Sequence, residues 1–202
     1  MLLLLIVTLF IILNLYFIFN LYLCDNSLKL QLAKNKDELK LNLFNKSPVL
    51  INIPKNIDKD IFNNLNNSYK NENYFNNLNL NKLINFDISL LNSNLLCNIK
   101  YSLTYFKDKQ IISFNKCKNN YHIISNIIGD EYYIYLLHPK YKKLNDDEKL
   151  KYSDKILIKP YDILIIPFGW EYLQDITSNT ILYHIDIDNY FTIIHNYILN
   201  NI

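Results

Sequence analysis

Residues 155–172 constrain the fold of this chain more than any other segment. Their sequence is Lys-Ile-Leu-Ile-Lys-Pro-Tyr-Asp-Ile-Leu-Ile-Ile-Pro-Phe-Gly-Trp-Glu-Tyr. Two short apolar runs, at 156–158 and 163–166, are separated by a Pro-Tyr-Asp turn, and a Pro-Phe-Gly corner ends the second run. Apolar runs this short, bounded by such breakers, are typical of β-strands, since a helix needs a longer uninterrupted stretch. The segment therefore predicts two strands joined by a turn, with Trp170 just after the second corner.

This segment resembles the cupin-like fold that Jumonji-type (JmjC) proteins share with iron(II)/2-oxoglutarate oxygenases. In that family a Pro-Gly-Asp turn leads into a buried strand and then into Ile-Pro-x-Gly-Trp-x-His, and an earlier segment follows a Gly-x-Lys…Leu-x-x-Pro pattern. The residues that fall on these landmarks are Gly129, Pro139, Pro160, Asp162, Pro167, Gly169 and Trp170. The resemblance implies a mainly β fold, a cupin-like double-stranded β-helix (jelly roll).

The second half of the chain contains short strand-like segments at regular spacing. We expect strands at 98–105, 110–114, 121–128, 131–137 and 180–187, and a terminal strand or helix at 190–198. Short strands at this spacing favour a barrel or a double-sheet jelly roll.

The first 23 residues are almost entirely apolar, interrupted only by Asn14 and Asn20. A run of about 20 apolar residues matches the ~30 Å hydrocarbon core of a bilayer. There is no basic segment at the start and no small-x-small cleavage site before Asp25, so an uncleaved transmembrane helix is favoured over a signal peptide. Lysines follow the helix but do not precede it, which predicts a single-pass membrane protein with its domain in the cytosol.

These features divide the chain into a transmembrane anchor (1–23), a polar spacer (24–45) and a cupin/JmjC-like β domain (46–195) with an Asn-rich insert around 63–77. The abundance of Asn, Ile, Leu and Lys is typical of an AT-rich coding sequence, as in some giant DNA viruses and some protists. The net charge of +2 argues against a nucleic-acid partner, which selects a concentrated basic face. Three cysteines without CxxC spacing predict neither a disulfide framework nor a zinc site.

The family resemblance also implies a site, and the residues at its positions depart from the pattern. The family holds iron(II) with His-x-Asp/Glu and a later His, and pairs the 2-oxoglutarate carboxylate with a lysine. By spacing, Lys116 and Lys118 stand at the His-x-Asp positions, Tyr172 at the later His and Glu131 at the lysine. Protonated lysines do not bind iron, and a glutamate would repel a dicarboxylate. The sequence thus predicts no catalytic, cofactor-binding or metal-binding residue.

One other set of residues could bind a metal. His184-Ile185-Asp186 is a literal His-x-Asp, and alternate residues of a strand share a face. With His122, which could enter the barrel from its own strand, His184 and Asp186 form an alternative metal set. The competing interpretation makes His184 and Asp186 a solvent-facing pair, because Ile181, Tyr183, Ile185 and Ile187 form the better core face.

We therefore expect a membrane-anchored, catalytically inactive cupin/JmjC-like protein with a binding or structural role. It would use no cofactor; its partners would be the lipid bilayer, through residues 1–23, and an unidentified protein. Two alternatives remain: an iron(II)/2-oxoglutarate-dependent protein hydroxylase, and an unrelated β-rich membrane-anchored interaction protein.

Overall fold

The computed structural model describes the backbone of residues 2–22, 29–33, 35–52 and 98–200, and their side chains except at 2–3, 6, 17–22, 36 and 198–200. The Asn-rich insert predicted around 63–77 lies outside the described residues. The described strands are β1 (Gln31–Leu32), β2 (Val49–Ile51), β3 (Asn98–Phe106), β4 (Gln110–Lys116), β5 (Tyr121–Ile128), β6 (Tyr132–Leu137), β7 (Asp154–Ile158), β8 (Ile163–Pro167), β9 (Glu171–Ile176) and β10 (Thr180–Asp188). The described helices are α1 (Leu2–Tyr22), α2 (Lys36–Phe44), the short η3 (Pro139–Tyr141), α5 (Asp146–Tyr152) and α6 (Tyr190–Asn200).

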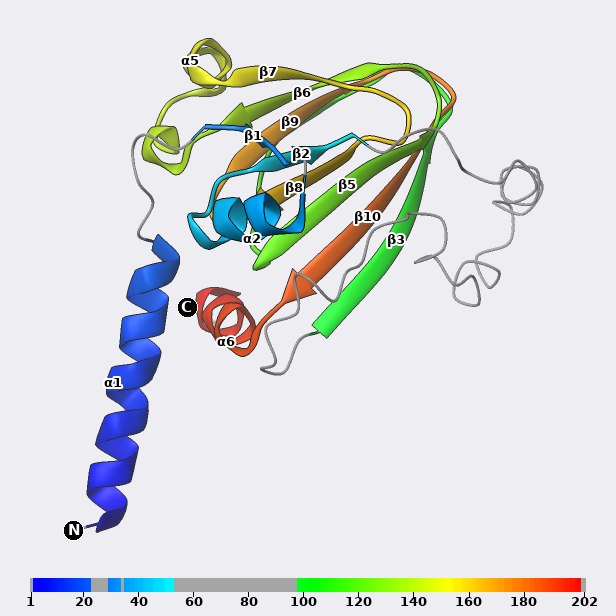
Figure 1. Ribbon diagram of the computed structural model, residues 1–202. Helices are drawn as coiled ribbons and strands as arrows, with labels where there is room; N and C mark the ends of the chain where they lie inside the picture. Colours follow the sequence, from blue (N-terminus) through cyan, green and yellow to red (C-terminus); the bar gives the residue numbers. More distant parts are fainter. Residues whose placement is uncertain (1, 23–28, 34, 53–97, 201–202) are drawn as a thin grey trace.

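The strands form two facing sheets (Figure 1). The larger sheet has the order β1-β2-β8-β5-β10-β3 and the smaller one β4-β9-β6-β7. From β3 onward the chain passes back and forth between the sheets, and the pairings among these strands are antiparallel. This winding confirms the predicted mainly β jelly roll. The two strands expected at 156–158 and 163–166 exist as β7 and β8, but they belong to different sheets.

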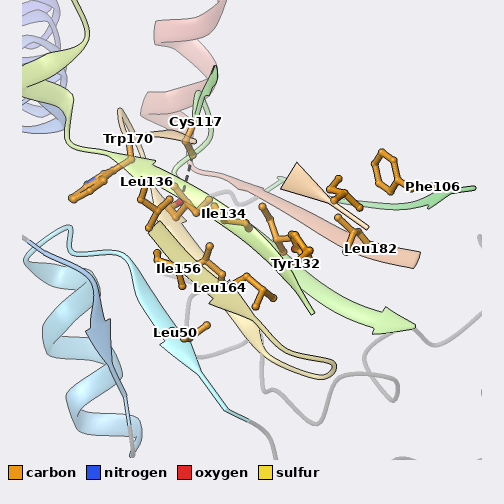
Figure 2. Close-up of a cluster of buried hydrophobic side chains, with 14 residues drawn as sticks. Leu50, Phe106, Cys117, Tyr132, Ile134, Leu136, Ile156, Leu164, Trp170 and Leu182 are labelled. Atoms are coloured by element: carbon orange, nitrogen blue, oxygen red, sulfur yellow. Dashed lines mark hydrogen bonds between the residues drawn. The ribbon is translucent and has the colours of Figure 1, made fainter. Parts of the chain in front are cut away.

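The buried side chains form two separate cores, one on each face of the larger sheet. We call the cluster between the sheets the inner core; it contains Leu50, Phe106, Cys117, Ile124, Tyr132, Ile134, Leu136, Ile156, Ile158, Leu164, Ile166, Trp170, Ile176 and Leu182 (Figure 2). The outer core lies on the opposite face of the larger sheet, under α2; it contains Leu39, Leu43, Val49, Ile123, Ile127, Ile163, Ile165, Tyr183, Ile185 and Ile187. Central strands such as β8 are therefore apolar on both faces, which explains their unbroken apolar runs.

The folded domain begins before residue 46. β1 pairs in parallel with β2, and Leu39 and Leu43 of α2 are buried in the outer core. Asn35 caps α2, because its side chain accepts a hydrogen bond from the backbone N–H of Glu38. Part of the segment predicted as a polar spacer is thus packed against the larger sheet.

Three corners adopt left-handed backbone conformations. Gly129 and Gly169, both predicted as corner glycines, have φ of 126° and 89°. Tyr161, which stands where the family pattern has a turn glycine, has φ of 73°; a side chain costs roughly 1–2 kcal/mol in this region. The turn is held by Asp162, whose Oδ2 accepts a hydrogen bond from the backbone N–H of Lys159 at 2.9 Å.

Helix α1 has 21 residues, contacts α6 and projects away from the sheets (Figure 1). Within the part of the chain that the structure describes, no helix is long and apolar enough to cross a membrane. The segment expected at 190–198 forms helix α6, not a strand.

Candidate functional site

Four strands bring polar side chains to one end of the jelly roll. The end of β10 lies beside the start of β5, so that Asp186 is directly opposite His122. In the facing sheet the end of β4 lies beside the start of β9, so that Asn115 is directly opposite Tyr172. Residues directly opposite each other in an antiparallel pair share a face. These pairs place His122, Asp186 and Tyr172 on the faces that enclose the inner core.

His122 is at the centre of this group. Its Nδ1 lies 2.6 Å from Oδ1 of Asp186. Its ring stacks against Tyr172 with centroids 5.3 Å apart, and against His184 with centroids 5.4 Å apart. The side chain of His122 is 10% exposed and that of Asp186 33% exposed. We call His122, Tyr172, His184 and Asp186 the inner cluster.

The charges of the inner cluster follow from its burial and its contacts. Burial alone would raise the pKa of Asp186, but the hydrogen bond from His122 and the electrostatic influence of His122, His184 and Lys100 lower it below its usual value. Burial lowers the pKa of His184 to about 3, and the electrostatic influence of the neighbouring His122 acts in the same direction. At neutral pH Asp186 is therefore ionised and His184 is neutral. An ionised carboxylate can only accept hydrogen bonds, so Nδ1 of His122 carries the proton and donates the hydrogen bond to Asp186.

Tyr172, which belongs to the inner cluster, and the neighbouring Cys117 both keep their protons at neutral pH. Burial raises the pKa of Tyr172, and the neighbouring Cys117 and Asp186 raise it further. Burial also raises the pKa of Cys117, whose Sγ lies 3.4 Å from the backbone oxygens of Asn119 and Ile166. Cys and Tyr side chains bind metals as anions, so each would have to lose its proton before it could be a ligand.

The interpretation that made His184 and Asp186 a solvent-facing pair holds only in part, because both residues are half-buried and 33% of the Asp186 side chain is exposed. Residues 183, 185 and 187 do form a core face, as the sequence indicated, but they pack in the outer core. The opposite face of β10 is also enclosed, because the smaller sheet covers it, and Leu182 on that face belongs to the inner core. His184 and Asp186 therefore point between the sheets, toward His122.

The structure also changes the register at the expected iron site. A bulge between Ile112 and Asn115 shifts β4 by one residue. As a result Lys116 pairs with Glu171, on the face away from Tyr172, and its ammonium lies 5.7 Å from the centre of the Phe168 ring. Asn115 is directly opposite Tyr172 and shares its face of the sheet but is exposed, whereas Cys117 is buried in the inner core. Spacing in the sequence had instead placed Lys116 and Lys118 at the His-x-Asp positions of the expected iron site.

Glu131 is distant from the inner cluster. It is exposed at the corner that follows β5, whereas His122 is near the start of that strand. The six residue steps from His122 to the end of β5 at Ile128 span about 20 Å. The neighbouring inward residue is Tyr132, which is fully buried in the inner core. Glu131 thus neither joins the cluster nor opposes a ligand bound there.

The inner cluster does not have the geometry of a metal site. Among the described residues, no three His, Cys, Asp or Glu side chains converge as metal ligands. The rings of His122 and His184 are stacked with an interplanar angle of 22°, so their nitrogen lone pairs do not converge on one point. The alternative metal set of His122, His184 and Asp186 is brought together by the fold, but as a stacked, hydrogen-bonded group.

One polar atom of the inner cluster, Nε2 of His122, is buried without a hydrogen-bond partner among the described residues. With the proton on Nδ1, Nε2 is an acceptor. A buried acceptor without a partner costs about 1–3 kcal/mol, which a bound hydrogen-bond donor would recover. Sequence analysis could not find this feature, because it depends on the pairing of β5 with β10.

Comparisons with known proteins support the fold. No protein-family model and no curated protein sequence matches this chain. Among solved structures, an oxidoreductase of the 2OG-Fe(II) oxygenase family from Burkholderia pseudomallei matches 81% of this chain and 96% of its own, with a TM-score of 0.51 and 6% identity. This chain has a cupin-like fold.

Two weaker matches cover about half of this chain and about half of their own chains. RmlC from Streptococcus suis, in complex with dTDP-D-xylose, matches 46% of this chain and 44% of its own, with a TM-score of 0.30 and 12% identity. dTDP-4-dehydrorhamnose 3,5-epimerase from Elizabethkingia anophelis matches 46% of this chain and 50% of its own, with a TM-score of 0.31 and 9% identity.

Proposed function

We propose that this protein is a non-catalytic, membrane-tethered member of the JmjC-like group of cupins, with a binding or structural role. The observation that carries the proposal is the arrangement of His122. Its ring stacks against Tyr172 and against His184, and its Nδ1 is hydrogen-bonded to Oδ1 of Asp186 at 2.6 Å. The hydrogen bond uses Nδ1 of the imidazole and one oxygen of the carboxylate, and it leaves the described residues of this end of the fold without a converging set of three ligands.

The residues at this end of the barrel do not fit iron(II). A facial site needs two imidazoles and a carboxylate that converge on the metal and leave other positions open. At the end of the smaller sheet near His122, Tyr172 and the buried Cys117 lie closest to the inner core, and neither the thiol nor the phenol is ionised at neutral pH. No step that requires iron is therefore assigned to this protein.

The proposed binding role is supported by Nε2 of His122, the buried hydrogen-bond acceptor of the inner cluster. Nε2 of His122 is buried without a partner among the described residues, and the stacking of Tyr172 and His184 fixes the direction of that edge. A small polar molecule that donates a hydrogen bond would match it. The rigid frame around His122 means that little entropy is lost on binding.

The tether is supported by the surface of α1. Its described side chains are apolar apart from Thr8 and Asn14, and large ones are exposed on every side: Leu4, Leu5, Val7, Leu9, Phe10, Ile11, Ile12, Leu13, Leu15 and Tyr16. A helix that is hydrophobic all round is stable only when lipid or protein covers it. We propose the bilayer as that cover, with the β domain on the cytosolic side.

Titration of the full-length chain in detergent with iron(II), or with manganese(II) in its place, tests the absence of a metal site. We expect binding of millimolar strength or weaker, no more than about 4 kcal/mol, with and without 2-oxoglutarate. The reason is that no converging ligand set exists among the described residues.

The matched control for this titration is His122→Gln, which removes one imidazole and keeps a polar side chain of similar size. A one-to-one dissociation constant in the low micromolar range for the native chain, lost in His122→Gln, would contradict the proposal. It would favour the iron-dependent hydroxylase alternative, with His122, His184 and Asp186 as the ligands to test next.

A further inference from the structure

Strand β3 (Asn98–Phe106) forms one edge of the larger sheet (Figure 1). Among the described residues, β10 is the one strand that pairs with it, at all nine positions and without a bulge. About half of the backbone N–H and C=O groups of an edge strand point away from the sheet, where a further strand can bind them. β3 contains one charged residue, Lys100, and neither proline nor glycine. It is therefore a long, regular template for one more strand.

The other three sheet edges in the described part of the chain have features that hinder such pairing. β1, at the opposite edge of the larger sheet, has only two residues. In the smaller sheet, β4 is interrupted by its bulge after Ile112, and β7 begins with Asp154 and Lys155. Short strands, bulges and charged residues are means by which proteins keep sheet edges from pairing. β3 has only Lys100, so it is the edge best suited to a partner.

The face of β3 that adjoins the outer core is apolar and incompletely covered. Ile99 and Leu103 pack against the outer core, and the ring of Tyr101 stacks on Tyr183 with centroids 6.2 Å apart. Tyr101 is nevertheless 42% exposed. Side chains on a strand added beside β3 would lie next to Tyr101 and cover more of its ring.

We propose that β3 pairs with β3 of a second copy of this chain, antiparallel and about a two-fold axis at Ser102. The two larger sheets would then form one continuous sheet. This pairing goes beyond the proposed binding role, and it depends neither on the tether nor on the acceptor of His122.

The argument for a second copy is that β3 is complementary to itself. A two-fold interface brings the same patch of both copies together, so the patch must match itself. A register centred on Ser102 pairs all nine residues and places no charge opposite a like charge, the central pairs being Ile99–Tyr105, Lys100–Thr104 and Tyr101–Leu103. A register centred on Lys100 would place two lysines directly opposite each other, which is destabilising. Strand length and charge therefore both select Ser102.

The pairing would also bring the inner clusters of the two copies near each other. Ser102 lies directly opposite His184 on β10, and Lys100 lies directly opposite Asp186. Neighbouring strands are about 4.8 Å apart, so the two-fold axis would lie one strand away from His184. A two-fold axis perpendicular to the sheet keeps both inner clusters on the same side of it.

Cysteine cross-linking of the full-length chain in detergent tests the pairing. Cys24 and Cys97 are replaced by serine, and the buried Cys117 is retained. Single cysteines are introduced by Ser102→Cys, Lys100→Cys and Thr104→Cys, three positions on one face of β3, and the chains are oxidised with copper–phenanthroline. Directly opposite residues have Cα atoms about 4.5–5.5 Å apart, a separation that a disulfide spans.

We expect Ser102→Cys to cross-link to its own copy several-fold faster than Lys100→Cys or Thr104→Cys, because each of these is four residues, about 13 Å, out of register with itself. A mixture of Lys100→Cys and Thr104→Cys chains should cross-link several-fold faster than either chain alone. These two results together would establish both the edge and its register.

Thr104→Lys, added to the Ser102→Cys chain, should slow cross-linking several-fold, because it places a lysine opposite Lys100 in each of the two symmetry-related pairs. Thr104→Val is the matched control and should leave the rate unchanged. Circular dichroism of each variant shows whether the fold is retained.

Equal rates at positions 100, 102 and 104 would show association through another surface, such as α1, and would overturn the pairing. Slow cross-linking at all three positions in a folded chain would show that β3 does not pair with a second copy. Self-cross-linking at position 100 or 104 in preference to 102 would contradict the register, and with it the argument from self-complementarity.

Discussion

Replacing Trp170 by alanine is expected to lower the free energy of unfolding by about 3–5 kcal/mol, as large truncations in a core do. The side chain is 1% exposed and packs in the inner core (Figure 2). Its indole N–H donates to the backbone oxygen of Lys46 at 3.1 Å, and His138 packs edge-on against its ring. The single indole thus joins the corner before β9 to the segment before β2. The measurement is chemical denaturation of the detergent-solubilised chain followed by circular dichroism.

Trp170→Phe is the matched control for this experiment. It keeps an aromatic ring in the core but removes the N–H, so the bond to Lys46 is lost while most apolar contact remains. It should cost less than Trp170→Ala. A loss below about 1 kcal/mol for Trp170→Ala would mean that the tryptophan is at the surface, and the arrangement of β8 and β9 described above would be wrong.

Gly129→Ala should have the second large effect, a loss of about 2–5 kcal/mol from backbone strain and overpacking together. A Cβ at this position would lie 2.6 Å from Oγ1 and 2.8 Å from Cα of Thr180. Thr180 is fully buried, and its hydroxyl donates to the backbone oxygen of Thr177 at 2.9 Å, so it has little room to move. The backbone also has φ of 126°, which L-residues rarely adopt.

Gly169→Ala separates the cost of backbone strain from the cost of overpacking. Gly169 also has positive φ, at 89°, but the nearest atom to an added Cβ is Cγ of Pro139 at 3.7 Å, an ordinary contact. Its cost should be that of backbone strain alone, roughly 1–2 kcal/mol. If thermal or chemical unfolding shows Gly129→Ala to cost no more than Gly169→Ala, the close approach of the β5–β6 corner to Thr180 is not present in solution.

The fold was accessible from the sequence because its corners carry rare residues. The two glycines and the prolines at 139, 160 and 167 stand out in a chain rich in Asn, Ile and Lys, and both glycines have the positive φ expected of them. The short strands between the corners followed from their apolar runs. The contribution of α2 could not be predicted, because its apolar residues are few and only packing against the larger sheet buries Leu39 and Leu43.

The site was less accessible, for two physical reasons. A bulge in β4 cannot be seen in the sequence, and it placed Asn115 opposite Tyr172 and Cys117 in the inner core, where spacing had indicated Lys116 and Lys118. A pattern of alternating residues identifies one apolar face, but β10 has a core on each side. For this reason His184 and Asp186 were assigned to solvent. Their contact with His122 depends on the register of β5 against β10, which no local pattern specifies.

The most direct test of the inner cluster is nuclear magnetic resonance of the histidine rings. The full-length chain, labelled with ¹⁵N-histidine in detergent, gives long-range proton–nitrogen correlations that distinguish Nδ1 from Nε2, with His122→Gln identifying the signals. We predict that Nδ1 of His122 carries the proton bonded to Asp186 at neutral pH, and that an equivalent of zinc(II) or cobalt(II) with 2-oxoglutarate leaves the signals of His122 and His184 unchanged. Metal-dependent shifts or broadening of both rings at one equivalent would contradict the account, because they would show that the two imidazoles bind a metal.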